Sequence, residues 1–185
     1  MRANPTTDAA FREVYEATFD DVRRFCLRRL PMSDVNDAVS EVYLVAWRKV
    51  DKVPRGDDAL PWLYGVARNV VRHIERGNRR RWRLNVKAMQ EPAGTVQGPE
   101  VQIVRRSDDE SLAIAIGRLS ELDREVIRLR AWEDLSAPAI AQVLDCSVSA
   151  AEKRVARAFK RLEKAVTARN EVTARRAATT EKGDA

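Results

Sequence analysis

Residues 136–161, SAPAIAQVLDCSVSAAEKRVARAFKR, decide how the last third of this chain folds. Apolar residues recur at helical spacing on both sides of a break at residues 145–147, which predicts two helices joined by a tight turn. Ala141 stands where two such helices cross closely, so that only a small side chain fits there. Asp145 stands where the turn requires a positive φ, a conformation that aspartate tolerates at some cost. The stretch therefore predicts a helix-turn-helix.

The second helix of this motif has the composition of a helix that contacts DNA. We expect Ser149 to cap it, with Glu152 three residues later completing a capping box. Small residues in its first turn and long basic side chains on its outer face suit entry of the helix N-terminus into a major groove. These residues are Ser149, Ala150 and Ala151, and then Lys153, Arg154, Arg157, Lys160 and Arg161. An ordinary helical hairpin with a solvated basic face stays open as the alternative, because such faces are common.

Two further helix starts are predicted upstream of the turn. Ser120 is expected to cap one helix, with Asp123 three residues on, and another is expected to start at Ser136, with Pro138 in its first turn. The inward positions are Leu122, Val126, Ile127 and Leu129 in the first helix, Ile140, Ala141, Val143 and Leu144 in the second, and Val155, Ala158 or Phe159, and Leu162 in the last.

The first half of the chain also has a helical period and no strand-like alternation. We expect helices from about Thr7 to Arg29, from a cap at Ser33 to about Val50, and from about Leu60 to Arg83. Their apolar stripes predict one compact bundle, with Trp47 in its core.

Residues 84–107 contain prolines and glycines and no sustained apolar stripe. We therefore predict an all-α chain of two small helical domains, residues 7–83 and 108–167, joined by a flexible linker at 84–107. Residues 168–185 are polar and basic and lack a core pattern, so we expect a disordered tail.

The composition favours a polyanionic partner. The formal net charge is +6, the sequence pI is about 9.7, and 34% of the residues are charged. The two cysteines, Cys26 and Cys146, are far apart and lack metal-ligand spacing, so we expect buried reduced thiols and no metal site. No cofactor is expected. No apolar run approaches membrane-spanning length and no signal peptide is evident, which predicts a cytoplasmic protein without membrane insertion.

Two helices of the first domain carry opposite charge. The third is basic, and with Trp62 and Asn69 it could lie along a phosphate backbone and hold unstacked bases. Its basic residues include Arg68, Arg72, Arg76 and Arg79, followed by Arg80, Arg81 and Arg83 around Trp82. The second helix has an acidic stripe of Asp34, Asp37 and Glu41, which is either a solvated face or a docking surface for a basic protein.

These stretches resemble sigma factors, most closely the extracytoplasmic-function group of the sigma-70 family. Residues 34–47, DVNDAVSEVYLVAW, resemble the helix that binds the clamp of core RNA polymerase. Residues 61–70, PWLYGVARNV, resemble the helix that reads the minus-ten promoter element. Residues 119–127, LSELDREVI, with 135–161, resemble the domain that reads the minus-thirty-five element.

The resemblance, joined to the charge pattern, implies a set of roles. Polymerase binding falls to Asp34, Asp37, Glu41 and Tyr43, minus-ten binding to the loop 53–59 with Trp62, Arg68, Asn69, Arg72, Arg76 and Arg79, and minus-thirty-five binding to Ser149, Ala150, Lys153, Arg154, Ala156, Arg157 and Lys160. The implied partners are core RNA polymerase (its beta-prime clamp and beta flap), promoter DNA and an anti-sigma factor.

Three positions depart from the family pattern. Ser40 stands where glutamine is common, Glu152 where lysine or arginine is common, and Asp145 where the turn usually has glycine. The first alternative function is a stand-alone helix-turn-helix regulator. An enzyme of RNA or nucleotide metabolism has little support, because the sequence has no glycine-rich phosphate loop and no nucleophile–base pattern.

Overall fold

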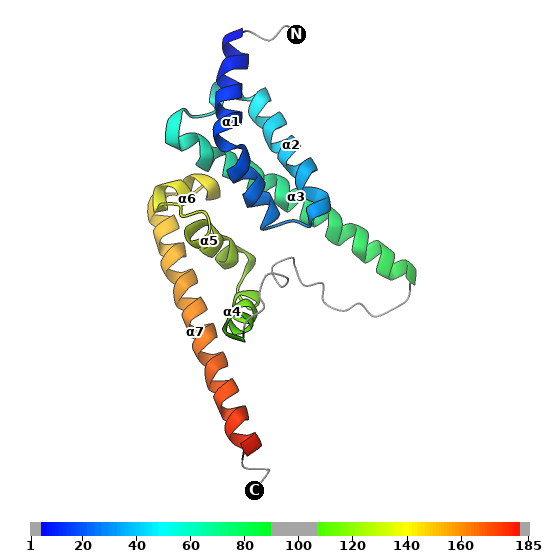
Figure 1. Ribbon diagram of the computed structural model, residues 1–185, viewed down its shortest axis with the longest axis vertical. Helices are drawn as coiled ribbons and strands as arrows, with labels where there is room; N and C mark the ends of the chain where they lie inside the picture. Colours follow the sequence, from blue (N-terminus) through cyan, green and yellow to red (C-terminus); the bar gives the residue numbers. More distant parts are fainter. Residues whose placement is uncertain (1–4, 90–106, 182–185) are drawn as a thin grey trace. The chain divides into compact units, whose positions relative to one another are not determined.

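The computed structural model describes residues 5–89 and 107–181, and the chain divides into two units. The first is built on helices α1–α3 and the second on helices α4–α7 (Figure 1). The described residues form helices and turns and no strand, which confirms the all-α prediction. In these two ranges, no helix has an apolar stretch long enough to cross a bilayer.

A short turn joins the first two helices, α1 (Pro5–Leu27) and α2 (Met32–Arg48). The N-cap of α2 is Pro31, which has an extended backbone (φ −57°, ψ 148°) and makes no side-chain cap hydrogen bond. The expected cap at Ser33 is therefore wrong. Ser33 lies inside the first turn, where its hydroxyl donates to Asp34 Oδ1 at 3.3 Å. Proline presets its own φ and has no N–H to satisfy, so the helix begins directly after it.

Two short 3-10 turns, η1 (Val50–Lys52) and η2 (Gly56–Asp58), lead into α3 (Ala59–Met89). Gly56 has a φ of +65°, a left-handed conformation that glycine adopts without steric cost. Pro61 lies in the first turn of α3, as expected. The helix runs past its expected end at Arg83, and its distal part extends beyond α1 and α2 (Figure 1).

The core of the first unit lies where α1, α2 and α3 pack against one another. Phe25 of α1 is fully buried, and its ring stacks on that of Tyr64 of α3 with centroids 4.8 Å apart. Trp47 was expected in the core and is instead exposed at its edge, because its ring packs edge-on against Phe11 at 5.0 Å on one side only. The other fully buried residues include Val22, Cys26, Val35, Ala38, Val42, Ala46, Leu63 and Ala67.

The second unit contains α4 (Ser107–Gly117), α5 (Glu121–Ala131), α6 (Ala137–Leu144) and α7 (Val148–Glu181), with α4 and α5 packed on α7. Ala158 fills the inward position of α7 and is fully buried, whereas Phe159 is exposed, which resolves the open choice between them. Leu122 was expected to face inward and is instead 41% exposed, because its neighbour Asp123 turns toward α7. The buried residues include Ala115, Leu119, Val126, Leu129, Ile140, Ala141 and Ala151.

The turn of the helix-turn-helix forms as predicted. Asp145 has a φ of +51°, the left-handed conformation expected at this position. The N–H of Cys146 donates to the carbonyl of Ala141 at 3.0 Å, and the N–H of Asp145 to that of Gln142 at 3.3 Å, which together close α6 with a Schellman motif. Cys146 is half-buried in this turn, while Cys26 is buried as expected.

The cap of α7 lies two residues earlier than expected. The hydroxyl of Ser147 accepts a hydrogen bond from the N–H of Ala150 at 3.2 Å, so Ser147 holds the cap position and Ser149 lies inside the first turn. The predicted capping box of Ser149 and Glu152 is therefore wrong. By contrast, Ser120 caps α5 as predicted, through the N–H of Asp123 at 3.1 Å.

Both domain ends are more helical than expected. Residues 84–89 belong to α3, and residues 90–106 of the expected linker lie outside the described residues. Residues 168–181 continue α7 to Glu181 instead of forming a tail without structure. This stretch has no proline or glycine and is rich in alanine and arginine, both good helix formers, so the helix propagates once the packed part has nucleated it.

Candidate nucleic-acid interface and docking face

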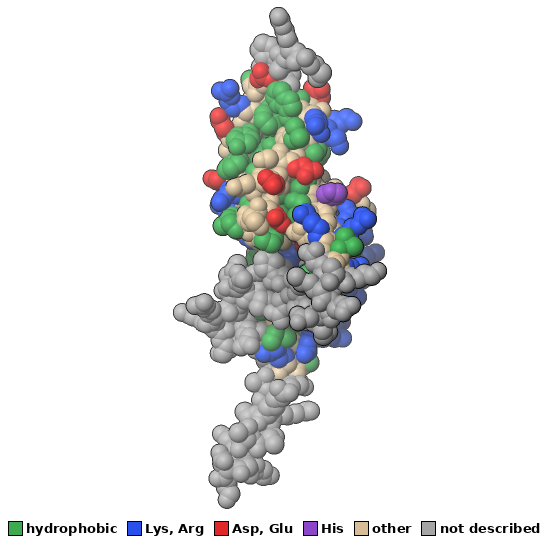
Figure 2. Space-filling view, turned by 90° about the vertical axis from the view of Figure 1, so that its right-hand side faces the viewer, with side chains coloured by type: hydrophobic (Ala, Val, Ile, Leu, Met, Phe, Trp, Pro, Cys, Tyr) green, Lys and Arg blue, Asp and Glu red, His purple; other side chains and the backbone are tan. Residues whose placement is uncertain are grey.

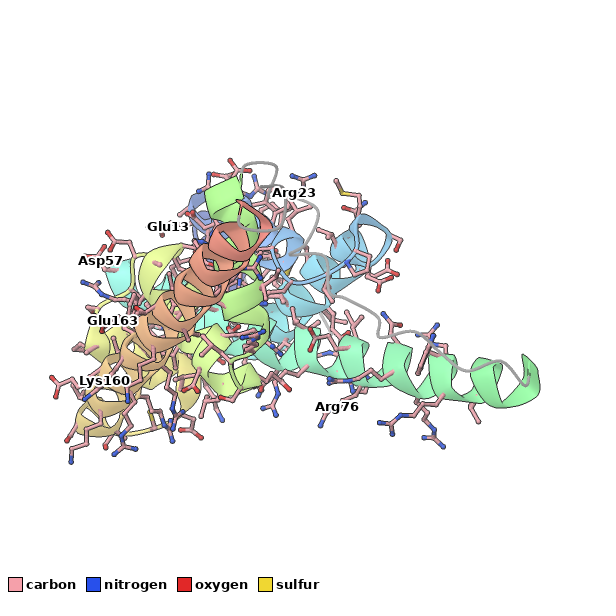
Figure 3. All side chains as sticks on the ribbon, turned by 90° about the horizontal axis from the view of Figure 1, so that it is seen from below. Glu13, Arg23, Asp57, Arg76, Lys160 and Glu163 are labelled. Carbon is pink, nitrogen blue, oxygen red and sulfur yellow. The ribbon has the colours of Figure 1, made fainter. Side chains whose placement is uncertain are left out.

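One face of α3 gathers the arginines expected to bind nucleic acid. At about 100° per residue, Arg72, Arg76 and Arg79 project within about 60° of one another. All three side chains are exposed. Figure 3 shows Arg76 pointing away from the helix, with further nitrogen-tipped side chains along the same stretch. The residues of α3 that face the core, such as Leu63 and Ala67, lie on the opposite side. The helix thus separates a buried apolar face from an exposed cationic one.

The start of α3 is less basic than its middle. Trp62 and Arg68 are half-buried, whereas Asn69 is exposed beside the arginine face. In the preceding loop, Asp57 and Asp58 are exposed at the N-terminal end of α3, where the helix dipole favours negative charge. A strand of DNA at this end would therefore meet an aromatic ring, an amide and backbone groups rather than a cluster of cations.

Two of the three acidic residues on one face of α2 are exposed. Asp34, Asp37 and Glu41 project within about 60° of one another. Asp37 and Glu41 are exposed, while Asp34 is half-buried because its Oδ2 accepts a hydrogen bond from Nδ2 of Asn78 at 2.8 Å. Figure 2 shows acidic side chains beside hydrophobic ones on the side of the first unit where α2 lies. The negative charge that α2 presents to a partner therefore comes mainly from Asp37 and Glu41.

Tyr43 supports this helix from inside rather than from its surface. Its side chain is buried, and its hydroxyl lies 2.9 Å from Oγ1 of Thr18 on α1. The ring packs against those of Tyr15 and Phe11, with centroids 4.7 and 6.3 Å away. Burial raises the pKa of Tyr43 to about 12, with the Thr18 hydrogen bond partly opposing the shift. Tyr43 thus fixes α2 against α1, which fits a supporting role and excludes a direct surface contact.

The basic face of α7 is continuous. Lys153, Arg157 and Lys160 project within about 60° of one another and are all exposed. Figure 3 shows Lys160 pointing away from α7. Ala150 lies on the same side one turn earlier, where its small side chain allows close approach, and Arg154 is half-buried on the flank.

Two residues near this face are not part of its cationic stripe. Arg161 donates to Asp123 of α5 at 2.6 Å, so its charge is paired within the unit. Glu152 is exposed on the flank, close to Ser149 and Ala156, and takes no part in the cap. The face is therefore bordered by carboxylates that would repel phosphate, Glu152 near its start and the exposed Glu163 further along the same flank.

Two basic residues that the sequence did not assign to a promoter element extend these two faces. Arg83 falls four residues after Arg79 on the α3 face, and Lys164 falls four residues after Lys160 on the α7 face; both are exposed. Their signal is the helical spacing itself, which continues each basic stripe by one turn. Arg83 was expected only as part of the basic end of the helix, and Lys164 follows Arg161, the last residue of the basic face named from the sequence.

Comparisons with known proteins point to one family. The model of Sigma-70 region 2 matches residues 14–81, and that of Sigma-70 region 4 matches residues 110–162. The RNA polymerase sigma factor CnrH of Cupriavidus metallidurans is 32% identical over 140 residues, which cover 72% of this chain and 73% of CnrH. The ECF RNA polymerase sigma-E factor of Escherichia coli K12 is 30% identical over 148 residues, covering 75% of this chain and 77% of that protein. The chain belongs to the extracytoplasmic-function sigma factors of the sigma-70 family.

The fold of this sigma factor is similar to that of a solved sigma factor. The sigma factor RpoE of Bartonella quintana, solved in complex with the anti-sigma factor NepR, matches it with a TM-score of 0.58 at 22% identity, covering 85% of this chain and 96% of that one. The match to region 2 includes α2 and the proximal part of α3, and the match to region 4 includes α5, α6 and the start of α7. Both regions occur in one chain, which favours the sigma factor over a stand-alone helix-turn-helix regulator.

Proposed function

We propose that this sigma factor contacts core RNA polymerase through α2, the minus-ten element through α3 and the minus-thirty-five element through α7. The observation that carries the proposal is the separation of charge within region 2. The exposed face of α2 is acidic, while that of α3 is a row of arginines. A protein that bound DNA alone would gain nothing from a carboxylate face, because carboxylates repel phosphate.

Docking on the polymerase rests on Asp37 and Glu41. Both are exposed and lie one turn apart on α2, so they can approach a basic partner surface together. Asp34 stands at the edge of the same face, and Tyr43 holds the helix in place from the core. Serine at position 40 offers a shorter side chain than the glutamine common in the family, which leaves the two carboxylates as the main docking groups.

Capture of the minus-ten element rests on the arginine face of α3 and on the residues at its start. Arg72, Arg76 and Arg79 would track the phosphates. Trp62 and Asn69 would hold a flipped or unstacked base, because an aromatic ring and an amide provide stacking and hydrogen bonds without demanding a duplex. By trapping single-stranded bases, the helix would help the promoter to melt.

Reading of the minus-thirty-five element rests on the first turns of α7. Ser149, Ala150 and Ala156 allow close approach to the groove, and Lys153, Arg157 and Lys160 reach bases or phosphates, with Arg154 at the flank. Since Ser147 caps the helix, the hydroxyl of Ser149 is left for DNA. Glu152 weakens phosphate binding at the border of this face.

We assign the two activities to two domains. Their helices run past the expected bounds of 7–83 and 108–167, to Met89 and Glu181, so the linker between them narrows to residues 90–106. The factor acts in the cytoplasm, where the polymerase is, and as an initiation factor rather than an enzyme. RpoE of Bartonella quintana was solved with an anti-sigma factor, and we infer that a comparable partner restrains this chain.

Run-off transcription on a library of genomic fragments tests the proposal. Core RNA polymerase is assayed with and without the purified protein, and new transcripts are mapped. We expect start sites that appear only with the protein and that share two upstream elements. If the protein binds the fragments but adds no start site across the library, the stand-alone regulator becomes the better account.

A further inference from the structure

A hydrogen bond between α2 and α3 marks the place where the basic helix leaves the bundle. Nδ2 of Asn78 donates to Oδ2 of Asp34 at 2.8 Å, across 44 residues of sequence. Both residues are half-buried, and the hydroxyl of Ser33 donates to the other oxygen of the same carboxylate at 3.3 Å. A hydrogen bond to an ionised carboxylate is stronger than one between neutral groups. The contact is therefore a well-defined link between the two helices.

The position of Asn78 on α3 gives this link its importance. Leu63, Ala67 and Val71 bury the core-facing side of α3, and Asn78 continues that side after two further turns. Residues 79–84, directly after it, are all exposed. Beyond Asn78 the helix has therefore left the apolar core, and its direction is set by the last contacts behind it.

The direction of α3 after Asn78 decides where its exposed arginines lie. Arg79 and Arg83 continue the cationic face that starts at Arg72, and Arg83 lies about 7 Å further along the axis than Asn78. A small change in the angle of α3 at Asn78 would move the side chains of Arg79 and Arg83 relative to the phosphates of a DNA backbone, whose spacing is fixed. Binding of several phosphates at once requires that the row of arginines match that spacing.

We propose that Asn78 is a positioning residue, which through Asp34 sets the direction of the distal part of α3 so that Arg79 and Arg83 meet promoter phosphates. The inference rests on the proposed function, in which this face binds the minus-ten region. It also gives Asp34 a different task from Asp37 and Glu41. Asp34 couples the helix that docks on the polymerase to the helix that contacts DNA, and its carboxylate is engaged inside the protein.

The test uses the full-length protein with core polymerase and a labelled promoter fragment recovered in the run-off screen. Asn78→Ala removes the donor, and Asn36→Ala, an exposed amide on α2, is the matched control. We expect Asn78→Ala to weaken promoter binding by the holoenzyme roughly threefold to tenfold, the range for the net loss of one ordinary, partly solvated hydrogen bond, and Asn36→Ala to leave it unchanged. Affinity for core polymerase stays the same in both variants. Equal promoter binding by Asn78→Ala and the wild type would overturn the proposal.

A second set of variants separates positioning from general stability. In the background Arg79→Gln/Arg83→Gln, the arginines that Asn78 positions are absent, so Asn78→Ala should add no further loss. The exchange Asp34→Asn/Asn78→Asp restores a donor and an acceptor across the two helices and should recover promoter binding. If Asn78→Ala costs as much without the two arginines as with them, its role is structural only. If the wild type itself adds no start site, the proposed function fails, independently of Asn78.

Discussion

Arg161 on α7 donates a hydrogen bond to Asp123 on α5, with 2.6 Å between Nη1 and Oδ2 and 38 residues between them in sequence. Asp123 is only 7% exposed, and its own N–H donates to Oγ of the capping Ser120. One residue therefore joins the cap of α5 to the helix that carries the minus-thirty-five face. This explains why Arg161, basic and on the expected outer side, is not free to bind DNA.

The coupling between these two residues can be measured. In a double-mutant cycle of Asp123→Ala and Arg161→Ala, we expect a coupling energy of about 1 kcal/mol in the free energy of unfolding. This energy is smaller than that of a buried ion pair, because the side chain of Arg161 is largely exposed and water screens its charge. Urea unfolding of the four proteins provides the numbers. Additive effects of the two substitutions would show that the pair does not hold α5 to α7.

The two serines at the start of α7 should separate stability from DNA binding. Ser147→Ala removes the cap and should lower the free energy of unfolding by about 1 kcal/mol. Ser149→Ala should leave stability nearly unchanged and weaken binding to the minus-thirty-five element. Thermal unfolding and promoter-binding assays on both variants give the comparison. The opposite order of stability would restore the Ser149 cap that the sequence predicted.

The left-handed conformation of Asp145 predicts an order of stability at that position. Asp145→Gly should be neutral or slightly stabilising, because the strain relieved at a φ of +51° is offset by the greater freedom of glycine in the unfolded chain. Asp145→Val should cost more than about 1 kcal/mol, since a β-branched side chain is strongly disfavoured there. Chemical unfolding of the three proteins tests the order, and a valine variant as stable as the wild type would contradict it.

Alkaline unfolding should report the burial of Tyr43. Its pKa in the folded protein is raised to about 12, whereas an unfolded tyrosine titrates near 10. The unfolded state therefore loses its proton first. The raised pKa of Tyr43 therefore contributes its full share to the free energy of unfolding below pH 10. This contribution is lost as the pH rises toward 12, a decrease on the order of 2 kcal/mol.

Tyr43→Phe should consequently show a smaller decline in unfolding free energy from pH 10 to 12 than the wild type. Urea unfolding of both proteins at each pH gives the two declines. Identical declines in the wild type and Tyr43→Phe would mean that the burial of Tyr43 does not raise its pKa.

The helices and the helix-turn-helix could be predicted from the sequence, because the spacing of apolar residues and the residues preferred in turns are local properties of the chain. The positive φ at Asp145 is an example, since only the break in the apolar pattern was needed to place it. The cap at Ser147 was missed because Ser147 and Ser149 are equally good caps, and a shift of two residues is decided by the packing of Ala151 and Ala158.

Hydrogen bonds between residues far apart in the chain could not be predicted from the sequence. Nothing local joins Asp34 to Asn78 or Asp123 to Arg161. From the sequence, Asp34 was therefore grouped with Asp37 and Glu41, Asn78 was not singled out, and Arg161 was placed on the DNA-binding face. The end of α7 was misjudged for another reason. A missing core pattern was taken as disorder, although the intrinsic propensity of residues 168–181 favours a helix.

The most direct measurement is run-off transcription with the charge-reversed variant Asp37→Lys/Glu41→Lys. The matched control is Glu13→Lys/Glu16→Lys, which makes the same change of charge at exposed positions of α1 in the same unit. We expect the α2 variant to lose every start site that depends on the protein, because it no longer docks on core polymerase, and the α1 variant to keep them. Unchanged transcription with Asp37→Lys/Glu41→Lys would contradict the central claim that α2 is the polymerase-binding face.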